Sequence, residues 1–421
     1  MNLLGGKVVG SGGFGCVFYP SLKCKKNLLF WNTKKFNGIS KLSLKKEIEK
    51  EEQLNNKIKP IILNIKNHDN YFLIDHIASC SPGKLSETDL EQYELCDSLI
   101  NLGITKENIN KNLNKLLILN IPYGGIDLYD YMSNVFREES RIMPPFGNKD
   151  FIKQFSFYNK KLINLLKHAI IPMNNLGLIH NDIKSNNLLI NDKNLKDGIK
   201  IIDWALCSIL TNKTTTIPEN IKYRGIQFNL PFSSIVFNPD FIDSYHKHIN
   251  KYNTMDIQYI NIKKLIQDFL VDIFNDYYIF FGHSLYIINY FFPLIYKDSN
   301  KILGEYAEFN KNIIGFEFLI NYVTNVLLNF TDFKKMKFNV EEYYYNVFSY
   351  NSDIWGFLSL YIDILFIFKN NNFNKKHIIN LVKKFLYNEK YAIEQIPLKE
   401  LLKDIANLKI YSNTKTKKKK K

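Results

Sequence analysis

The chain has 421 residues, of which 46% are hydrophobic and 23% are charged, a balance typical of globular rather than disordered proteins. Its formal net charge of +15 would suit an acidic partner such as nucleic acid or an anionic membrane surface. Nearly all of this charge is lysine, because arginine occurs only at Arg137, Arg141 and Arg224. Specific base recognition relies on bidentate arginine, so we expect no specific nucleic-acid binding.

Cysteine usage and hydropathy bear on where the chain works. The cysteines show neither zinc-ligand spacing nor a disulfide framework, which favours a reducing, cytoplasmic compartment; they are Cys16, Cys24, Cys80, Cys96 and Cys207. The N-terminus lacks the basic and apolar regions of a secretory signal. Tyr277–Tyr296 has the apolar character of a membrane span, but Gly282, Pro293 and its many tyrosines favour a buried helix pair. We therefore expect no transmembrane segment.

The first part of the chain is predicted to be rich in strands. Apolar runs of strand length occur at Leu3–Gly10, Cys16–Leu22, Phe36–Leu42, Tyr71–His76 and Leu116–Ile121. A helix is predicted over Ser43–Ile58, because Leu44, Ile48 and Leu54 recur on one helical face.

After Tyr123-Gly124-Gly125 the apolar pattern becomes helical, first over Asp127–Val135 and then over Phe151–Leu176. Strands followed by helices predict an α+β arrangement of two lobes joined at a short hinge. We expect a strand-rich N-lobe over residues 1–121 and a helical C-lobe over residues 122–412, with a large insertion at about residues 237–351. Residues 413–421 are lysine-rich and are predicted to form a disordered basic tail that could attract an acidic partner.

A cluster of glycines separates the first two predicted strands, in Gly10-Ser11-Gly12-Gly13-Phe14-Gly15-Cys16-Val17. Glycines at this spacing let the backbone approach phosphate oxygens and offer N–H groups to them. A strand rather than a helix follows, which argues against a dinucleotide-binding fold. Taken alone, the cluster would also suit an ordinary tight hairpin.

A polar loop follows the long predicted helix and reads His180-Asn181-Asp182-Ile183-Lys184-Ser185-Asn186-Asn187. An aspartate there can orient or accept the proton of an attacking hydroxyl, and an asparagine five positions later can reach a metal ion. Asp203 ends an apolar strand shortly afterwards and is well placed to hold magnesium. Taken singly, Asp182 could be a turn residue and Asp203 a strand-ending residue.

Together with Lys41, an acidic helix residue and Ser352-Asp353-Ile354-Trp355, these motifs resemble the protein kinase superfamily in their order. The resemblance covers Val8–Trp355 and implies a two-lobed fold that uses ATP and Mg²⁺ to phosphorylate serine or threonine on a protein substrate. In the family, the aspartate of the last motif braces the catalytic loop. The biased composition and the segment Gln227–Ser233 resemble the divergent serine/threonine kinases of large nucleocytoplasmic DNA viruses, including the mimivirus type. That likeness implies a location in the host cytoplasm or the virion.

The resemblance also assigns roles to individual residues. It implies that Asp182 is the catalytic base, that Lys184 contacts the γ-phosphate, and that Asn187 and Asp203 are magnesium ligands. The nucleotide-binding residues that it implies are Gly10, Ser11, Gly12, Gly13, Phe14, Gly15, Val17, Lys41, Glu51, Leu119, Ile121, Tyr123 and Asp127.

Several of these nucleotide-binding assignments carry a specific expectation. Lys41 would anchor phosphate, and Glu51 would be its partner because it lies on the apolar face of the predicted helix, with Glu52 as the second choice. Leu119 would be the gatekeeper beside the adenine pocket, and Ile121–Tyr123 the hinge. Asp127 would reach the ribose, cap the next helix, or do both.

The chain departs from the family pattern at two places and leaves two rival functions open. Asn181 replaces an arginine that commonly clasps a phosphorylated loop, and Trp204-Ala205 replaces Phe-Gly. We therefore expect aromatic packing of the insertion, rather than phosphorylation of Thr214–Thr216, to hold the active arrangement.

The rival functions are a small-molecule kinase of the aminoglycoside or choline type, which shares an Ile-Asp-Trp-like strand, and a pseudokinase that acts as a binding scaffold. The glycine loop, Lys184 and the Ser352–Trp355 motif favour the protein kinase.

Overall fold

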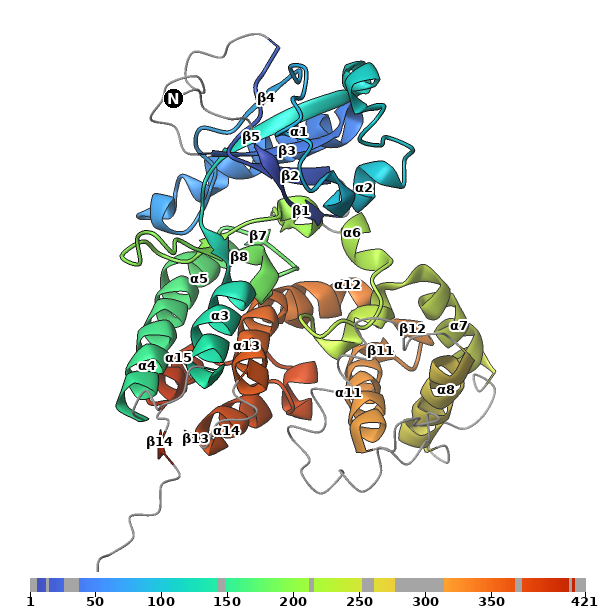
Figure 1. The fold of residues 1–421 in the computed structure, drawn as a ribbon. Coiled ribbons are helices and arrows are strands. Elements are labelled where there is room, and N and C mark those ends of the chain that lie inside the picture. The colour runs from blue at the N-terminus through green and yellow to red at the C-terminus, as the bar shows by residue number, and fades with distance from the viewer. Residues whose placement is uncertain are drawn as a thin grey trace, which may run out of the picture. The chain divides into compact units, whose positions relative to one another are not determined.

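The computed structural model describes residues 6–12, 15–25, 38–141, 148–211, 216–251, 261–276, 314–367, 373–408 and 411–412. The chain is a mixed α+β protein, as the sequence predicts, and it divides into two compact units (Figure 1). The first unit comprises residues 1–126 and 189–205, and the second comprises residues 127–188 and 206–421. The predicted lobe boundary lay after residue 121 and did not assign residues 189–205 to the first unit.

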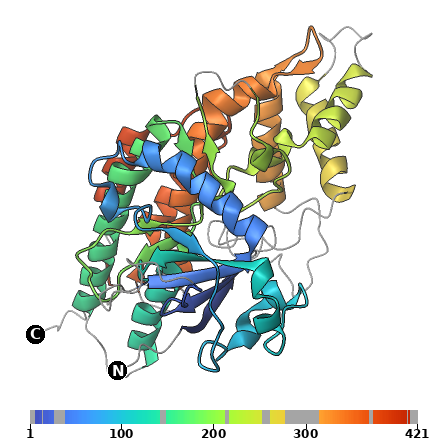
Figure 2. The ribbon, with the colours of Figure 1, turned by 90° about the horizontal axis from the view of Figure 1, so that it is seen from above.

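The first unit is built on a five-stranded antiparallel sheet with the order β1-β2-β3-β5-β4. Its strands are β1 (Lys7–Gly12), β2 (Gly15–Tyr19), β3 (Gly38–Leu44), β4 (Ala78–Cys80) and β5 (Leu116–Pro122). Helix α1 (Lys45–Ile62), the long blue helix in Figure 2, follows β3 directly. Its buried residues Ile48, Ile58 and Ile62 recur at helical spacing, so α1 packs one apolar face beside β3 and β5.

One predicted strand of this unit is wrong. Tyr71–His76 is not a strand, because Phe72 makes only an isolated bridge to Ile201 and His76 adopts a positive φ of 58°, which breaks an extended run. The edge strand β4, which pairs with β5 on the side away from β3, begins two residues later, at Ala78. Between β4 and β5 lie short helical turns and α2 (Asp97–Ile100), and β8 (Leu188–Ile190) leads into β9 (Lys200–Ile201).

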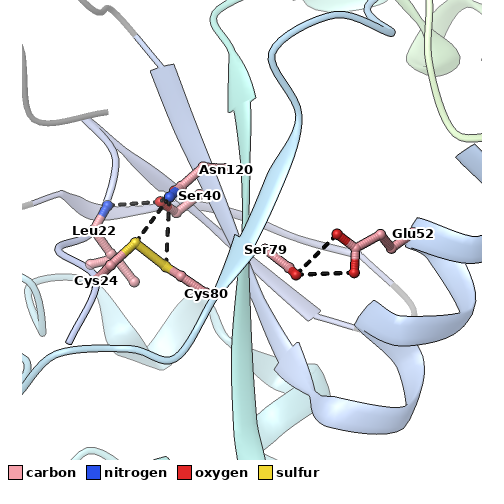
Figure 3. Close-up of a disulfide and its surroundings, with 7 residues drawn as sticks. All are labelled: Leu22, Cys24, Ser40, Glu52, Ser79, Cys80 and Asn120. Atoms are coloured by element: carbon pink, nitrogen blue, oxygen red, sulfur yellow. Dashed lines mark hydrogen bonds between the residues drawn. A yellow bond between two sulfur atoms is a disulfide. The ribbon is translucent and has the colours of Figure 1, made fainter. Parts of the chain in front are cut away.

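Two disulfides cross-link the first unit. Cys16 pairs with Cys96, with their Cα atoms 5.4 Å apart, and Cys24 pairs with Cys80, with their Cα atoms 5.8 Å apart. Figure 3 shows the second bridge beside the Asn120 side chain, which donates to Cys24 Sγ at 3.5 Å. The expectation of no disulfide framework is therefore wrong for four of the five cysteines, and these four do not support a reducing compartment. The partners are 80 and 56 residues apart, so only the tertiary fold brings them together.

The second unit is mainly helical. Its helices are α3 (Leu128–Arg141), α4 (Asn148–Leu165), α5 (Ile171–Asn175), α6 (Glu219–Lys222), α7 (Pro239–Asn250), α8 (Ile262–Asp276), α11 (Ile314–Phe330), α12 (Val340–Tyr343), α13 (Ser349–Ile367), α14 (Lys376–Phe385) and α15 (Leu398–Ala406). Its short strands are β7 (Leu178–Ile179) with β10 (Ser208–Ile209), β11 (Thr331–Asp332) with β12 (Lys337–Phe338), and β13 (Phe373–Asn374) with β14 (Tyr411–Ser412). The chain passes between the units at β6 (Ile126–Asp127).

Two long helical segments position the loop that contains Asp182. The segment predicted over Phe151–Leu176 runs through α4, a π-helical turn at Leu166–Ile170, and α5. It ends at Gly177, whose φ of 78° and close approach to Leu210 O require glycine. Helix α13 is buried on all sides over nearly its whole length, which makes it the core helix of the unit.

The described part of the insertion packs through aromatic rings. The ring of Phe237 stacks on Tyr343 with centroids 5.7 Å apart, and its edge meets Phe348 at 4.6 Å. The whole stretch Tyr277–Tyr296, Thr214 and Thr215, and the tail 413–421 lie outside the described residues, as Gly13 and Phe14 do. Among the helices that the structure describes, none is sufficiently long and apolar to span a bilayer.

Candidate active site

The loop that follows β7 is anchored at both ends to α13. The Asp353 carboxylate accepts the backbone N–H groups of His180 and Asn181, each at 2.8 Å, and Asp363 accepts the Ser185 hydroxyl at 2.7 Å. The expectation that the aspartate of the Ser352–Trp355 motif braces this loop is confirmed. Gly356 allows the close approach, because a Cβ atom there would lie 2.5 Å from Ile183 O.

Asp182 is surrounded by hydrogen-bond donors at the centre of this loop. Its Oδ2 atom accepts from Lys184 Nζ at 2.9 Å and from Asn187 Nδ2 at 2.8 Å, and its Oδ1 atom accepts from Asn229 Nδ2 at 2.8 Å. The structure therefore brings together Asp182, Lys184 and Asn187, which the sequence singled out. Burial would raise the pKa of Asp182, but the Lys184 charge, the hydrogen bonds of Lys184 and Asn229, and the Arg224 charge lower it below its ordinary value. The carboxylate is thus ionised at neutral pH and can accept a proton or orient a hydroxyl group.

Asn181 forms part of the same network although it lacks a charge. Its side-chain Nδ2 donates to Ser208 Oγ at 2.8 Å, and its side-chain Oδ1 accepts from Ser352 Oγ at 2.9 Å. Its φ of 60° lies in the left-handed region, which asparagine tolerates better than most residues. Asn181 thus ties the loop to β10 and α13 instead of offering a cation.

The cation and amide beside Asp182 that sequence reasoning missed are Arg224 and Asn229. Arg224 Nη1 donates to the backbone oxygen of Asn181 at 2.5 Å, and its Nη2 atom lies 3.6 Å from Asp182 Oδ1. Both residues are far from Asp182 in sequence, so the motif around Asp182 does not include them. The available signals were that Arg224 is among only three arginines in a lysine-rich chain and that Asn229 lies in the distinctive segment Gln227–Ser233.

In the first unit, Lys41 forms an ion pair with the residue that helical periodicity selected. Lys41 Nζ lies 2.6 Å from Glu51 Oε2, which joins β3 to α1. The carboxylate of Glu52, the second choice, instead accepts from Ser79 Oγ at 3.0 and 3.1 Å (Figure 3). The two adjacent glutamates therefore have different partners.

Several predicted nucleotide-binding residues form a row across one face of the sheet. Gly10 on β1 lies opposite Val17 on β2, Val17 lies opposite Lys41 on β3, and Lys41 lies opposite Leu119 on β5. Residues directly opposite in antiparallel strands present their side chains on the same face, and Ile121 shares that face because it lies two residues after Leu119. The sheet thus offers one continuous surface that joins the glycine segment to the lysine.

The described part of the glycine segment packs closely against β3 where it enters β2. Gly12 pairs with Gly15, and Ser11 pairs with Cys16. A Cβ atom on Gly15 would lie 2.8 Å from Leu42 O, so β2 and β3 can approach only with glycine at this position.

The predicted hinge residue Tyr123 packs against neighbours of its own unit. Its ring centroid lies 5.0 Å from that of Tyr19, Lys193 Nζ lies 4.8 Å above its ring, and its hydroxyl donates to Asp192 at 3.3 Å.

In the second unit, the Asp127 carboxylate accepts the backbone N–H of Asp130 at 2.9 Å, so Asp127 caps the first turn of α3. Burial raises the pKa of Asp127 to about 6.

The two predicted magnesium ligands are oxygen donors suited to that ion. Asp203 lies just after β9 in the first unit, where it is exposed and has a φ of 65°. In the second unit, the Asn187 side-chain nitrogen faces Asp182, which turns its Oδ1 atom away and leaves this oxygen to serve as a ligand. The residues that the structure describes include no group of three or more His, Cys, Asp or Glu side chains that could hold a metal ion. Magnesium that arrives with a nucleotide usually needs only one or two protein oxygens as ligands. The carboxylate of Asp203 and the amide oxygen of Asn187 are oxygens of the required type.

Comparison with known proteins yields no match to a protein-family model and none to a curated sequence. The functional inference therefore depends on the residues and their geometry.

Proposed function

We propose that the chain is an ATP- and Mg²⁺-dependent serine/threonine protein kinase with a two-lobed kinase-like fold. The observation that carries this proposal is the environment of Asp182. An ionised, mostly buried carboxylate receives hydrogen bonds from Lys184 and Asn187 and sits on a loop braced by α13. An isolated turn aspartate would need none of these supports.

The geometry suits phosphoryl transfer to a hydroxyl group. Asp182 Oδ1 or Oδ2 would accept the hydroxyl proton as the nucleophile attacks, and the Lys184 ammonium would steady the charge of the moving phosphoryl group. Bound Mg²⁺–ATP would supply the phosphoryl group, with Asn187 and Asp203 as the metal ligands contributed by the chain. Catalysis of this kind consists mainly of positioning and charge stabilisation, which a preorganised loop provides.

The first unit supports the nucleotide-binding half of the proposal. The Lys41–Glu51 pair would hold the lysine toward the phosphates, beside the row of residues that runs from Gly10 to Leu119. The buried Leu119 side chain would lie at the adenine end of this row.

Transfer of labelled γ-phosphate from ATP tests the proposal and separates it from its rivals. The purified chain is incubated with Mg²⁺, labelled ATP and one of three acceptors: a basic protein, an aminoglycoside or choline. We expect label in phosphoserine or phosphothreonine of the protein, and none when Mg²⁺ is chelated. Label on a small molecule alone would favour the small-molecule kinase. Magnesium-dependent ATP binding without any transfer would favour the scaffold.

A further inference from the structure

The segment between β10 and α7 returns, within the second unit, to the loop of residues 180–187, called the catalytic loop after its proposed role. Arg224 follows α6 and is only 7% exposed, and its guanidinium group reaches the backbone oxygen of Asn181 and the Asp182 carboxylate. Its Nη2 atom also donates to Gln227 Oε1, which keeps the side chain from swinging toward solvent. Separating a buried guanidinium group from a buried carboxylate costs free energy, because each charge would then be desolvated without a partner.

Asn229 approaches Asp182 from the same segment. Its side chain is fully buried and donates to Asp182 Oδ1 at 2.8 Å. The backbone around it is fixed by two further bonds, from Trp355 Nε1 to Phe228 O at 3.1 Å and from Ser234 Oγ to Gly225 O at 2.9 Å. Asn229 is therefore held in place by α13 and by its own segment.

The two oxygens of Asp182 thus have separate sets of partners. Lys184 and Asn187, from the catalytic loop itself, contact Oδ2, whereas Arg224 and Asn229 contact Oδ1. Contacts to Oδ2 alone would hold the carboxylate through one oxygen and leave Oδ1 without a protein donor. The second set of contacts holds Oδ1, and it depends on the 224–229 segment being docked.

We propose that Arg224 and Asn229 are positioning residues that set the Asp182 carboxylate, so that the 224–229 segment assembles the site without a regulatory phosphate. This inference rests on the proposed kinase function. A phosphate orders a loop by pairing its charge with a cation of the protein. In this chain an equivalent charge pair already exists between Arg224 and Asp182, and Asn181 needs no charge of its own.

The test compares Arg224→Met, Arg224→Lys and Asn229→Ala with the control Lys222→Met. Lys222 is a cation two residues from Arg224 whose partner is the exposed Glu219 on α6. We expect Arg224→Met and Asn229→Ala each to lower kcat by about 100-fold through misplacement of Asp182, with an unchanged KM for ATP. Arg224→Lys should recover part of kcat, since it retains the charge but not the paired donors.

Two further measurements complete the test. Phosphatase-treated wild-type protein should keep its kcat. Backbone hydrogen exchange across residues 178–188 should become faster in Arg224→Met and Asn229→Ala but not in Lys222→Met. Exchange is measurable even in a wild-type protein that transfers no phosphate, so a failure of the kinase proposal is distinguishable from a failure of this one.

Unchanged kcat and unchanged exchange in folded Arg224→Met and Asn229→Ala proteins would overturn the inference. A rise in the KM for ATP alone, an equal loss in Lys222→Met, or loss of activity on phosphatase treatment would overturn it as well. If Arg224→Met does not fold, Arg224→Lys and Asn229→Ala decide by the same criteria.

Discussion

The Lys41 ammonium and the Glu51 carboxylate lie 2.6 Å apart and connect the central strand of the sheet to α1. Both side chains remain partly exposed, at 23% and 31%, so the pair contributes little to stability. Its value would lie in holding the Lys41 side chain in one orientation above the sheet face shared with Val17 and Leu119.

Substitutions of this pair should affect activity unequally. We expect Lys41→Met to lower kcat/KM by about 100-fold or more, because it removes the proposed phosphate contact, and Glu51→Gln to lower it by less, because it only loosens the lysine. Glu52→Gln is the matched control, since Glu52 contacts Ser79 instead. Steady-state phosphorylation rates measure all three, and a larger loss in Glu52→Gln than in Glu51→Gln would contradict the pairing.

Asp203→Asn should weaken the use of magnesium. The substitution replaces the charged oxygen of a proposed ligand with a neutral amide, so the Mg²⁺ concentration needed for half-maximal activity should rise, together with the Kd for Mg²⁺–ATP. Titration of nucleotide binding with and without Mg²⁺ measures the effect. Asp268→Asn, on the exposed face of α8, serves as the control. Equal Mg²⁺ dependence in wild type and Asp203→Asn would show that Asp203 is not a ligand.

Counting thiols tests the disulfides directly. Burial raises the pKa of the Cys207 thiol to about 12, so this cysteine should resist alkylation in the native protein. The four remaining cysteines are paired, so protein denatured without a reductant should have one reactive thiol, and denatured, reduced protein should have all five. In Cys207→Ser the first count should fall to zero. Five thiols in protein purified and denatured without reductant would contradict the pairing.

Gly356→Ala should destabilise the second unit and slow catalysis. A new Cβ atom would lie 2.5 Å from Ile183 O, so either α13 or the catalytic loop must shift. Overpacking of this kind typically costs about 1–3 kcal/mol in the free energy of unfolding. Gly225→Ala is the matched control for stability, because an added Cβ atom there meets nothing within 4 Å. Denaturant unfolding that gives equal stabilities for the two variants would contradict the close approach of α13 to Ile183.

Site residues that lie close together in the sequence could be predicted from it, whereas residues that reach the site from a distant segment could not. Asp182, Lys184 and Asn187 fall within six consecutive positions, so a local motif contains them all, and Glu51 could be chosen over Glu52 from helical periodicity. Arg224 and Asn229 could not be predicted, because only the return of their segment to the loop brings them to Asp182.

The secondary structure and the disulfides were likewise predictable only where the signal lay within one segment. The strand predicted at Leu116–Ile121 corresponds to β5, since its apolar run is long and ends at a proline and glycines. The run at Tyr71–His76 has strand composition but pairs with β9 only through the single bridge between Phe72 and Ile201, and a pattern within one segment does not report on its neighbours. The disulfides were missed for a related reason, because they join segments that are adjacent only in the folded unit.

Whether Asp182 carries phosphoryl transfer is tested most directly by comparing wild type and Asp182→Asn in a single-turnover assay with Mg²⁺, labelled ATP and a basic acceptor protein. Asparagine keeps the shape of the side chain but cannot accept the proton. We expect the wild type to label serine or threonine and Asp182→Asn to be slower by about 100-fold or more, with unchanged ATP binding. Equal transfer rates in the two folded proteins, or no transfer by either, would contradict the proposed function.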